Sequence, residues 1–98
     1  MILTTTNSVE GYKIIEYKGL VTGTSSNVKT KFSFKTEKNL DISTEVINTA
    51  QEEAFQKLQE HAELKNANAV VGISVDFENF QGSYFFVTVI GTAVHIAK

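Results

Sequence analysis

The first segment with a regular pattern is predicted to form a strand, because apolar and other residues alternate along it. This segment covers residues 12–21, and its apolar face carries Ile15, Tyr17 and Val21. Such a pattern is typical of a strand that is covered on one side only. Gly11 precedes the segment and Gly23 follows it, and we expect a positive φ at both glycines.

A second strand is predicted for residues 29–36, where alternation is strict. Lys29, Lys31 and Lys35 share one side of it, and lysine on one face is a common guard against aggregation at a sheet edge. Residues 24–27 have the composition of a turn. The two strands are therefore predicted to form a hairpin whose second arm lies at an edge.

The period then changes to that of a helix, which begins at Asp41 or Ser43, either of which is a suitable N-cap, and runs to Lys65. Asn66 follows the last turn and is expected in the left-handed C′ conformation. The glutamates indicate a solvated face. The opposite apolar stripe, which Phe55 widens, consists of Ile47, Ala50, Ala54, Leu58 and Ala62.

The last third of the chain is predicted to be a second hairpin. Residues 70–78 alternate, residues 79–83 supply the connection, and the final strand covers residues 84–96. Both faces of the final strand are largely apolar, which predicts a central strand with dry surroundings on each side. We therefore expect an α+β fold of two layers, with one long helix on one face of an antiparallel sheet.

A single helix shields only one face of such a sheet. The other face of the last strand would present Phe85, Val87 and Val89, or their alternates, to water. Burying each of these side chains contributes roughly 1.5–3 kcal/mol, so we expect a second copy to cover them as an interface. The alternative is that the first hairpin folds across this face as a further layer.

Bulk composition narrows the class of protein. The 98 residues are enough for one domain, residues 1–98, and a net charge of −2 argues against a nucleic-acid partner. There is no cysteine, which removes disulfides and thiolate metal sites. The sequence contains neither a signal-peptide pattern nor an apolar run of membrane-spanning length. We therefore expect a cytoplasmic protein without a membrane partner.

Candidate ligands for a divalent metal are few. Asp76 and Glu78 share one strand face with Ser74, and carboxylates suit hard cations, although a polar stripe is the simpler interpretation. His95 could line the central opening of a ring or be an ordinary strand-end histidine. His61 is expected to be a solvated helix-end residue. No serine lies in a nucleophile-elbow context, so we assign no catalytic residue and expect no enzyme.

Several short blocks together resemble the YbjQ-like family, which is described as a "putative heavy-metal-binding domain". The resemblance implies a two-layer fold of the dodecin-subunit type, with the last strand central, assembled as a homopentameric ring. The chain departs from the family between residues 24 and 40, and it has Lys18 in the neighbourhood where many relatives have a cysteine in the first strand. The blocks are Thr4-Thr5, Glu10-Gly11, Ile15–Tyr17, Gly19, Val21, Gly23, Ala50, Ala54, Leu58, Ala62, Asn68–Ile73, Asp76 and Gly91–Val94.

The function expected from these observations is that of a small homo-oligomer with a metal- or small-ligand-binding role. The metal or ligand role comes from the resemblance, and self-association comes from the apolar pattern of the last strand. Two alternatives stay open: an enzyme whose composite site lies between subunits, and a structural scaffold.

Overall fold

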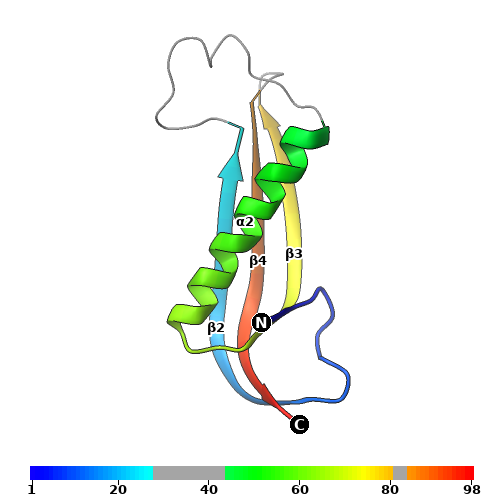
Figure 1. The fold of residues 1–98 in the computed structure, drawn as a ribbon, viewed down its shortest axis with the longest axis vertical. Helices are drawn as coiled ribbons and strands as arrows, with labels where there is room; N and C mark the ends of the chain where they lie inside the picture. Colours follow the sequence, from blue (N-terminus) through cyan, green and yellow to red (C-terminus); the bar gives the residue numbers. More distant parts are fainter. Residues whose placement is uncertain (28–43, 81–83) are drawn as a thin grey trace.

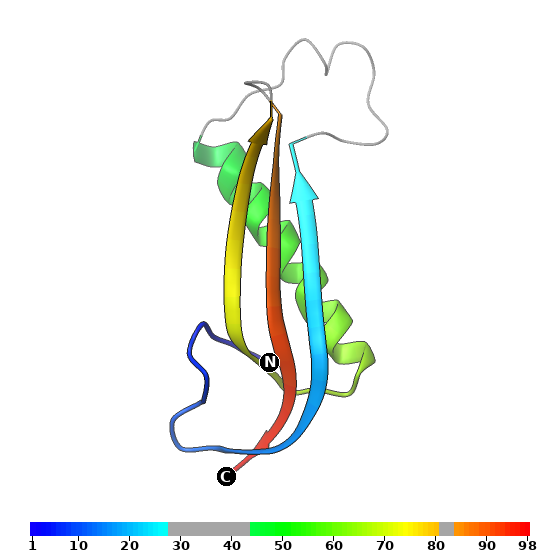
Figure 2. The same cartoon turned by 180° about the vertical axis from the view of Figure 1, so that it is seen from behind.

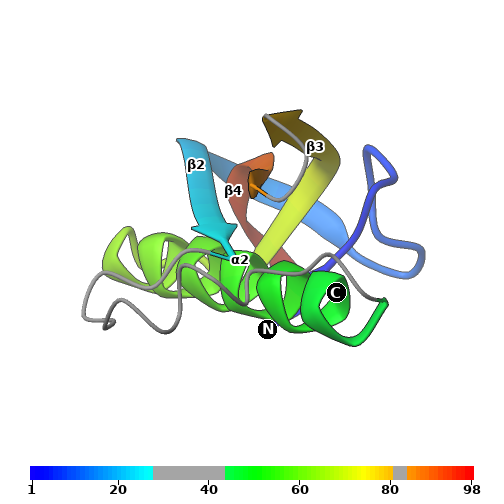
Figure 3. The same cartoon turned by 90° about the horizontal axis from the view of Figure 1, so that it is seen from above.

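The computed structural model describes residues 1–27, 44–80 and 84–98 as one helix laid across a narrow sheet (Figure 1). The sheet order is β1-β3-β4-β2, and the molecule measures 50 × 21 × 18 Å. Seen from behind and from above, the helix covers a single face of the three long strands (Figures 2 and 3). The elements are β1 (Ile2–Leu3), β2 (Lys13–Ser26), α2 (Thr44–Leu64), β3 (Ala69–Phe80) and β4 (Tyr84–Ala97).

Strand β4 lies between β2 and β3 and is antiparallel to both, which confirms the predicted central position of the last strand. The sheet is mixed, however, because β1 pairs in parallel with the start of β3. Backbone bonds from Thr4 N–H to the Val70 carbonyl and from Gly72 N–H to the Thr6 carbonyl extend this contact. The expectation of a wholly antiparallel sheet was therefore wrong at this edge.

Strand β2 is longer than predicted. It continues through the expected turn to Ser26, which pairs with Phe86, while Gly23 pairs with Val89. The long partner β4 supplies backbone bonds along this whole stretch, and these outweigh the turn preference of threonine and serine. The second strand expected at residues 29–36 lies outside the described residues.

Two irregularities in β2 change which side chains face the core. The register with β4 shifts between Ile14 and Glu16 and again between Tyr17 and Gly19. Each shift resets the alternation, because one extra residue turns the following side chains to the other face. Ile15 and Tyr17 are consequently 60% and 69% exposed, whereas Val21 is buried. The predicted apolar face is correct only for Val21.

The main core lies between α2 and the sheet. Ala50, Ala54, Leu58 and Ala62 are buried there, which confirms the predicted stripe. Gly23 lacks a positive φ, contrary to expectation, because its role is a different one: a Cβ at this position would lie 2.0 Å from the Ala54 carbonyl oxygen. The glycine therefore lets the helix backbone approach β2 closely.

A second, smaller cluster lies on the opposite face near the N-terminal end of β3, where Val9 and Ile14 pack against it. Gly72 has a φ of 62°, and the register between β3 and β4 shifts between Val71 and Ser74. This shift places Val71 in the second cluster, although Val70 and Ile73 belong to the main core. The members of the second cluster are Ala69, Val71, Val94 and Ile96.

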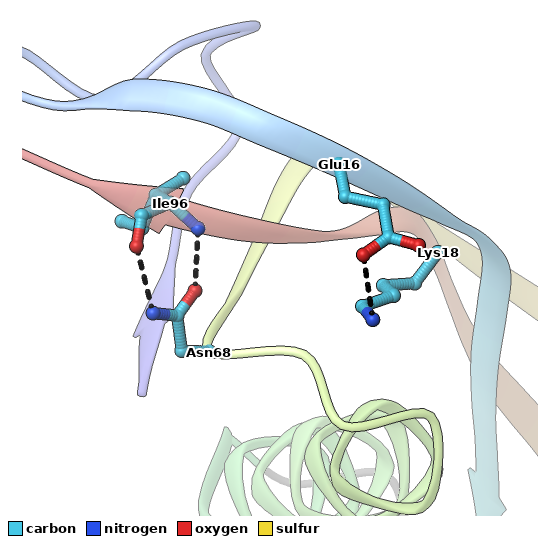
Figure 4. Close-up of polar contacts among 4 residues, drawn as sticks. All are labelled: Glu16, Lys18, Asn68 and Ile96. Atoms are coloured by element: carbon cyan, nitrogen blue, oxygen red, sulfur yellow. Dashed lines mark hydrogen bonds and ion pairs between the residues drawn. The ribbon is translucent and has the colours of Figure 1, made fainter.

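The link from α2 to β3 is held by two asparagines. Asn66 has a φ of 62°, as predicted, and the Ala67 N–H donates to the Ala62 carbonyl at 3.1 Å, the bond pattern of a Schellman motif. The Asn68 side-chain amide then donates to the Ile96 carbonyl at 2.9 Å and accepts from the Ile96 N–H at 2.8 Å (Figure 4). Asn68 thereby continues the pairing of β3 with β4 beyond the strand itself.

Among the described residues, no helix is both long and apolar enough to span a bilayer.

Candidate functional site

The face of the sheet away from α2 is open along the half that holds the start of β4 and the end of β2 (Figure 2). Its apolar side chains come from alternate positions of β4 and from β2. Ile90 is 45% exposed although β4 is a central strand, and Leu20 on the neighbouring strand β2 is 72% exposed. Among the described residues, the large exposed apolar side chains along this half, called the outer face below, include Leu20, Tyr84, Phe86 and Ile90.

The three residues predicted to form an interface lie elsewhere. Phe85, Val87 and Val89 have no exposed surface, because they face α2 and belong to the main core. They are therefore not available to a second copy, and this part of the prediction needs correction. Their alternates along β4, which the prediction also allowed, form the exposed row.

The two candidate carboxylates, Asp76 and Glu78, lie on this outer face. Asp76 pairs with Thr88, and Glu78 pairs with Phe86, so both stand beside the exposed row of β4. Both side chains are exposed. Two positions along a strand separate them by roughly 6.6 Å, close enough for both carboxylates to approach one cation. Calcium, however, takes about six to eight oxygen ligands, so one copy supplies too few side chains.

His95 lies far from these carboxylates. It is exposed on β4 opposite Glu16, seven positions from Thr88, which corresponds to roughly 23 Å along the strand. Glu16 itself forms an ion pair with Lys18 at 3.0 Å (Figure 4). Within one copy, His95 therefore cannot share an ion with Asp76. Across residues 1–27, 44–80 and 84–98, no three histidine or acidic side chains gather closely enough to hold a metal.

His61 has a contact that the sequence analysis missed. Its Nδ1 accepts the backbone N–H of Thr22 at 3.2 Å, so it is not simply a solvated helix-end residue. One helical turn earlier, Lys57 Nζ donates to the Thr24 carbonyl at 3.0 Å. Both backbone groups belong to β2, which is an outer strand among the strands that the structure describes. Side chains of α2 thus occupy hydrogen-bonding groups that an edge strand would otherwise present to other chains.

The spacing of this pair follows from the geometry of the two elements. Four residues of a helix rise about 6 Å, and two residues of a strand advance about 6.6 Å. Lys57 and His61 can therefore meet Thr24 and Thr22 at the same time. These contacts between α2 and β2 could not be predicted from the sequence, because the prediction requires knowing that α2 crosses β2 and in which direction. Only the i, i+4 spacing of the two basic side chains was visible.

Comparisons with known proteins agree with this fold. The chain is 38% identical over 104 residues to a "UPF0145 protein" of Clostridium kluyveri, covering 96% of this chain and 97% of that protein. It is also 38% identical over 109 residues to a "UPF0145 protein" of Actinobacillus pleuropneumoniae serotype 5b, covering 98% and 99%.

A solved structure is similar along nearly the whole length. It is a crystal structure of a protein of unknown function of the DUF74 family from Pediococcus pentosaceus, with a TM-score of 0.68, 25% identity and coverage of 99% of this chain and 98% of that chain. A family model with the description "Putative heavy-metal-binding" matches residues 1–97. With that match over almost all of its length, the chain belongs to the YbjQ-like family.

Proposed function

We propose that this protein works as a homo-oligomer that buries the outer face, and that it binds divalent cations through carboxylates which assembly brings together. The observation that carries the proposal is the exposed row of Leu20, Tyr84, Phe86 and Ile90 on the face of the sheet that α2 does not cover. A pentameric ring is the subunit number that the family resemblance implies. The non-enzymatic role and the cytoplasmic location belong to the same proposal.

The magnitude of the apolar contribution supports assembly. The four side chains each expose roughly half of their surface, so burial would contribute on the order of 1 kcal/mol per side chain. Two copies together would gain about 8 kcal/mol, which is comparable with the cost of association at about 4–15 kcal/mol. The threonines that flank the row, including Thr22, Thr24 and Thr88, would have to add hydrogen bonds or close contacts.

Chemistry on the same face supports a cation as the ligand. Carboxylate oxygens suit hard cations, whereas soft metals favour thiolates and thioethers, and this chain has no cysteine and a single methionine. Asp76 and Glu78 of one copy offer two carboxylates, and a neighbouring copy would double that number. We therefore propose that the metal-binding role in the family description corresponds, in this chain, to a site of oxygen ligands between copies.

Assembly is tested by Ile90→Glu, which places a charge in the centre of the exposed row. We expect native mass spectrometry to show an oligomer for the unaltered chain and a monomer for Ile90→Glu, with unchanged circular dichroism. The matched control is Leu64→Glu, because Leu64 is 84% exposed near the end of α2 and lies away from the outer face. A monomeric unaltered chain would refute the proposal.

Cation binding is tested separately by titration with Ca²⁺, Zn²⁺ and Ni²⁺ while the melting temperature is followed. We expect a Ca²⁺-dependent rise that disappears in the double variant Asp76→Asn, Glu78→Gln. The control is Glu52→Gln, which removes one exposed carboxylate from α2. A rise that survives the double variant, or no rise with any of the three ions, would remove the cation from the proposal.

A further inference from the structure

We propose that the N-terminal segment forms a binding site for a small organic cation that carries a primary ammonium group on a short alkyl chain. The site is a hollow of about 560 Å³ between the extended residues 2–6 and the turn that leads into β2. The proposal goes beyond the function proposed above, because the hollow adjoins the start of β3, whereas Asp76 and Glu78 lie near its end. The hollow is lined by Ile2, Thr4, Thr6, Ser8, Val9 and Glu10.

Backbone hydrogen bonds to β3 hold one wall of the hollow in place. The Thr4 carbonyl accepts from the Ile73 N–H at 3.1 Å, and the Thr6 carbonyl accepts from the Gly72 N–H at 2.7 Å. Alternate residues of an extended segment direct their side chains to the same side. Ile2, Thr4 and Thr6 therefore form a single wall, with one apolar and two hydroxyl side chains.

The opposite wall is a tight turn. The Tyr12 N–H donates to the Val9 carbonyl at 3.0 Å, and Gly11 between them has a φ of 86°. These are the features of a type II turn, in which Glu10 occupies the first central position with a defined backbone conformation. Val9 also packs against the second cluster, so this wall is anchored to the sheet. Among the residues that the structure describes, the exposed Glu10 carboxylate forms no ion pair.

The threonine hydroxyls of the hollow are arranged as hydrogen-bond acceptors. Thr6 Oγ1 donates its single hydrogen to the Ser8 carbonyl at 2.6 Å. The 2.8 Å contact between Thr4 Oγ1 and Thr6 Oγ1 must therefore use the Thr4 hydrogen. Thr4 Oγ1 in turn accepts from the Thr6 N–H at 3.1 Å. Because both hydroxyl hydrogens are used within the segment, these two oxygens can offer only lone pairs to a ligand.

This lining determines the chemical class of the ligand. Lone pairs beside a carboxylate suit a positively charged hydrogen-bond donor, and an ammonium group has three N–H donors and no acceptor. Glu10 is the only acidic residue of the lining, which is too few for Ca²⁺ with its roughly six to eight oxygen ligands. Ile2 and Val9 provide apolar contact that an alkyl chain can use and a bare inorganic ion cannot.

Binding is tested by titrating the full chain with n-butylammonium chloride at neutral pH while its backbone amides are followed by NMR. We expect saturable shifts at residues 2–10 with a Kd on the order of 10 mM, because exposed charges contribute little. Absence of saturable shifts there would overturn the proposal.

Two further ligands test the two parts of the cation separately. Ammonium chloride lacks the alkyl chain and should bind about tenfold more weakly than n-butylammonium. The neutral analogue n-butanol lacks the charge and should bind roughly threefold to fivefold more weakly. If ammonium bound as tightly as n-butylammonium, the hollow would be a site for an inorganic ion, and if n-butanol did, the charge would have no role. Either result would contradict the proposal.

Variants assign the binding to the hollow. Glu10→Gln keeps the size of the side chain but removes its charge, so n-butylammonium should bind roughly threefold to fivefold more weakly. Thr6→Val removes one acceptor oxygen and should weaken binding by roughly threefold to tenfold. The matched controls are Glu45→Gln, in the first turn of α2, and Thr5→Val, whose side chain is exposed outside the hollow; both should bind as the unaltered chain does. Because Thr6 also orders the segment, Glu10→Gln is the decisive variant, and unchanged affinity in it would exclude this site.

Discussion

On the face of the sheet that α2 covers, Leu58, Ala54 and Val89 have no exposed surface, whereas on the opposite face Leu20 and Ile90 expose 72% and 45%. The same strands supply both faces, so their backbone geometry is shared. What differs is the covering layer: a 21-residue helix on one side and a short N-terminal segment around Val9 on the other.

This difference separates the residues that should determine the stability of one copy from those that would determine the assembly proposed above. Where α2 crosses β2 the helix face has almost no spare volume, because a Cβ on Gly23 would collide with the helix backbone, whereas Val75 and Phe77 on the β3 side of this face are 44% and 41% exposed. The opposite face still has apolar surface to bury. Substitutions on the helix face should therefore change the free energy of unfolding of each copy, and substitutions on the outer face should change association between copies.

The largest contrast is expected between Leu58→Ala and Leu20→Ala. Leu58 is completely buried, so its truncation should lower the free energy of unfolding by about 3–4 kcal/mol. Leu20→Ala should cost no more than about 0.5 kcal/mol in dilute solution. Chemical denaturation at two protein concentrations measures both. If the cost of Leu20→Ala rises with concentration, a second copy covers the outer face.

A somewhat smaller effect is expected for Gly23→Ala. Its new Cβ would lie 2.0 Å from the Ala54 oxygen and 2.7 Å from the Leu58 nitrogen, so the helix must shift, at a cost of about 2–3 kcal/mol. Gly11→Ala is the control, since nothing lies within 4 Å of its Cβ and only its φ of 86° is unfavourable. Thermal denaturation should show the larger loss for Gly23→Ala. Equal losses would mean that the close approach is not tightly constrained.

The smallest effect is expected for Val9→Ala, which thins the cover over the second cluster. Val9 is only partly buried against Val71 and Val94, so we expect a loss of about 1 kcal/mol in chemical denaturation. Val9→Ile is the matched variant and should be close to neutral. If Val9→Ala lowered the free energy of unfolding as much as Leu58→Ala, the two faces would contribute equally to the stability of one copy.

Much of the helix and the last strand could be predicted from residue patterns. The stripe that includes Ala54 and Leu58 has one period and one buried face, and the two apolar faces of β4 indicated a central strand. These patterns hold because burial acts on every turn or on every second residue. Asn66 was predictable for a similar local reason, since few residues adopt its backbone conformation.

The remaining features depend on contacts between distant segments. Strand β2 continues through Ser25 because β4 pairs with it there. The register shift next to Ile15 interrupts the alternation of apolar and polar residues, so the alternation could not predict it. For the candidate site, the placement of Asp76 and Glu78 on one face was predictable from their spacing. The choice between the two faces of β4 was not, because both are apolar, and this is why Phe85 was assigned to the wrong side.

The position of β4 in the sheet has a consequence for synthesis of the chain. Among the described strands, every long pairing involves β4 (Tyr84–Ala97), the last of them in the sequence, and contacts such as Val21 with Gly91 connect distant parts of the sequence. Pairings of this kind form slowly, since a long loop must close before they gain any stability. On the ribosome, β2 and β3 therefore lack their common neighbour until β4 has been synthesised. During that interval the nascent chain depends on its own charged residues, or on chaperones, to avoid aggregation.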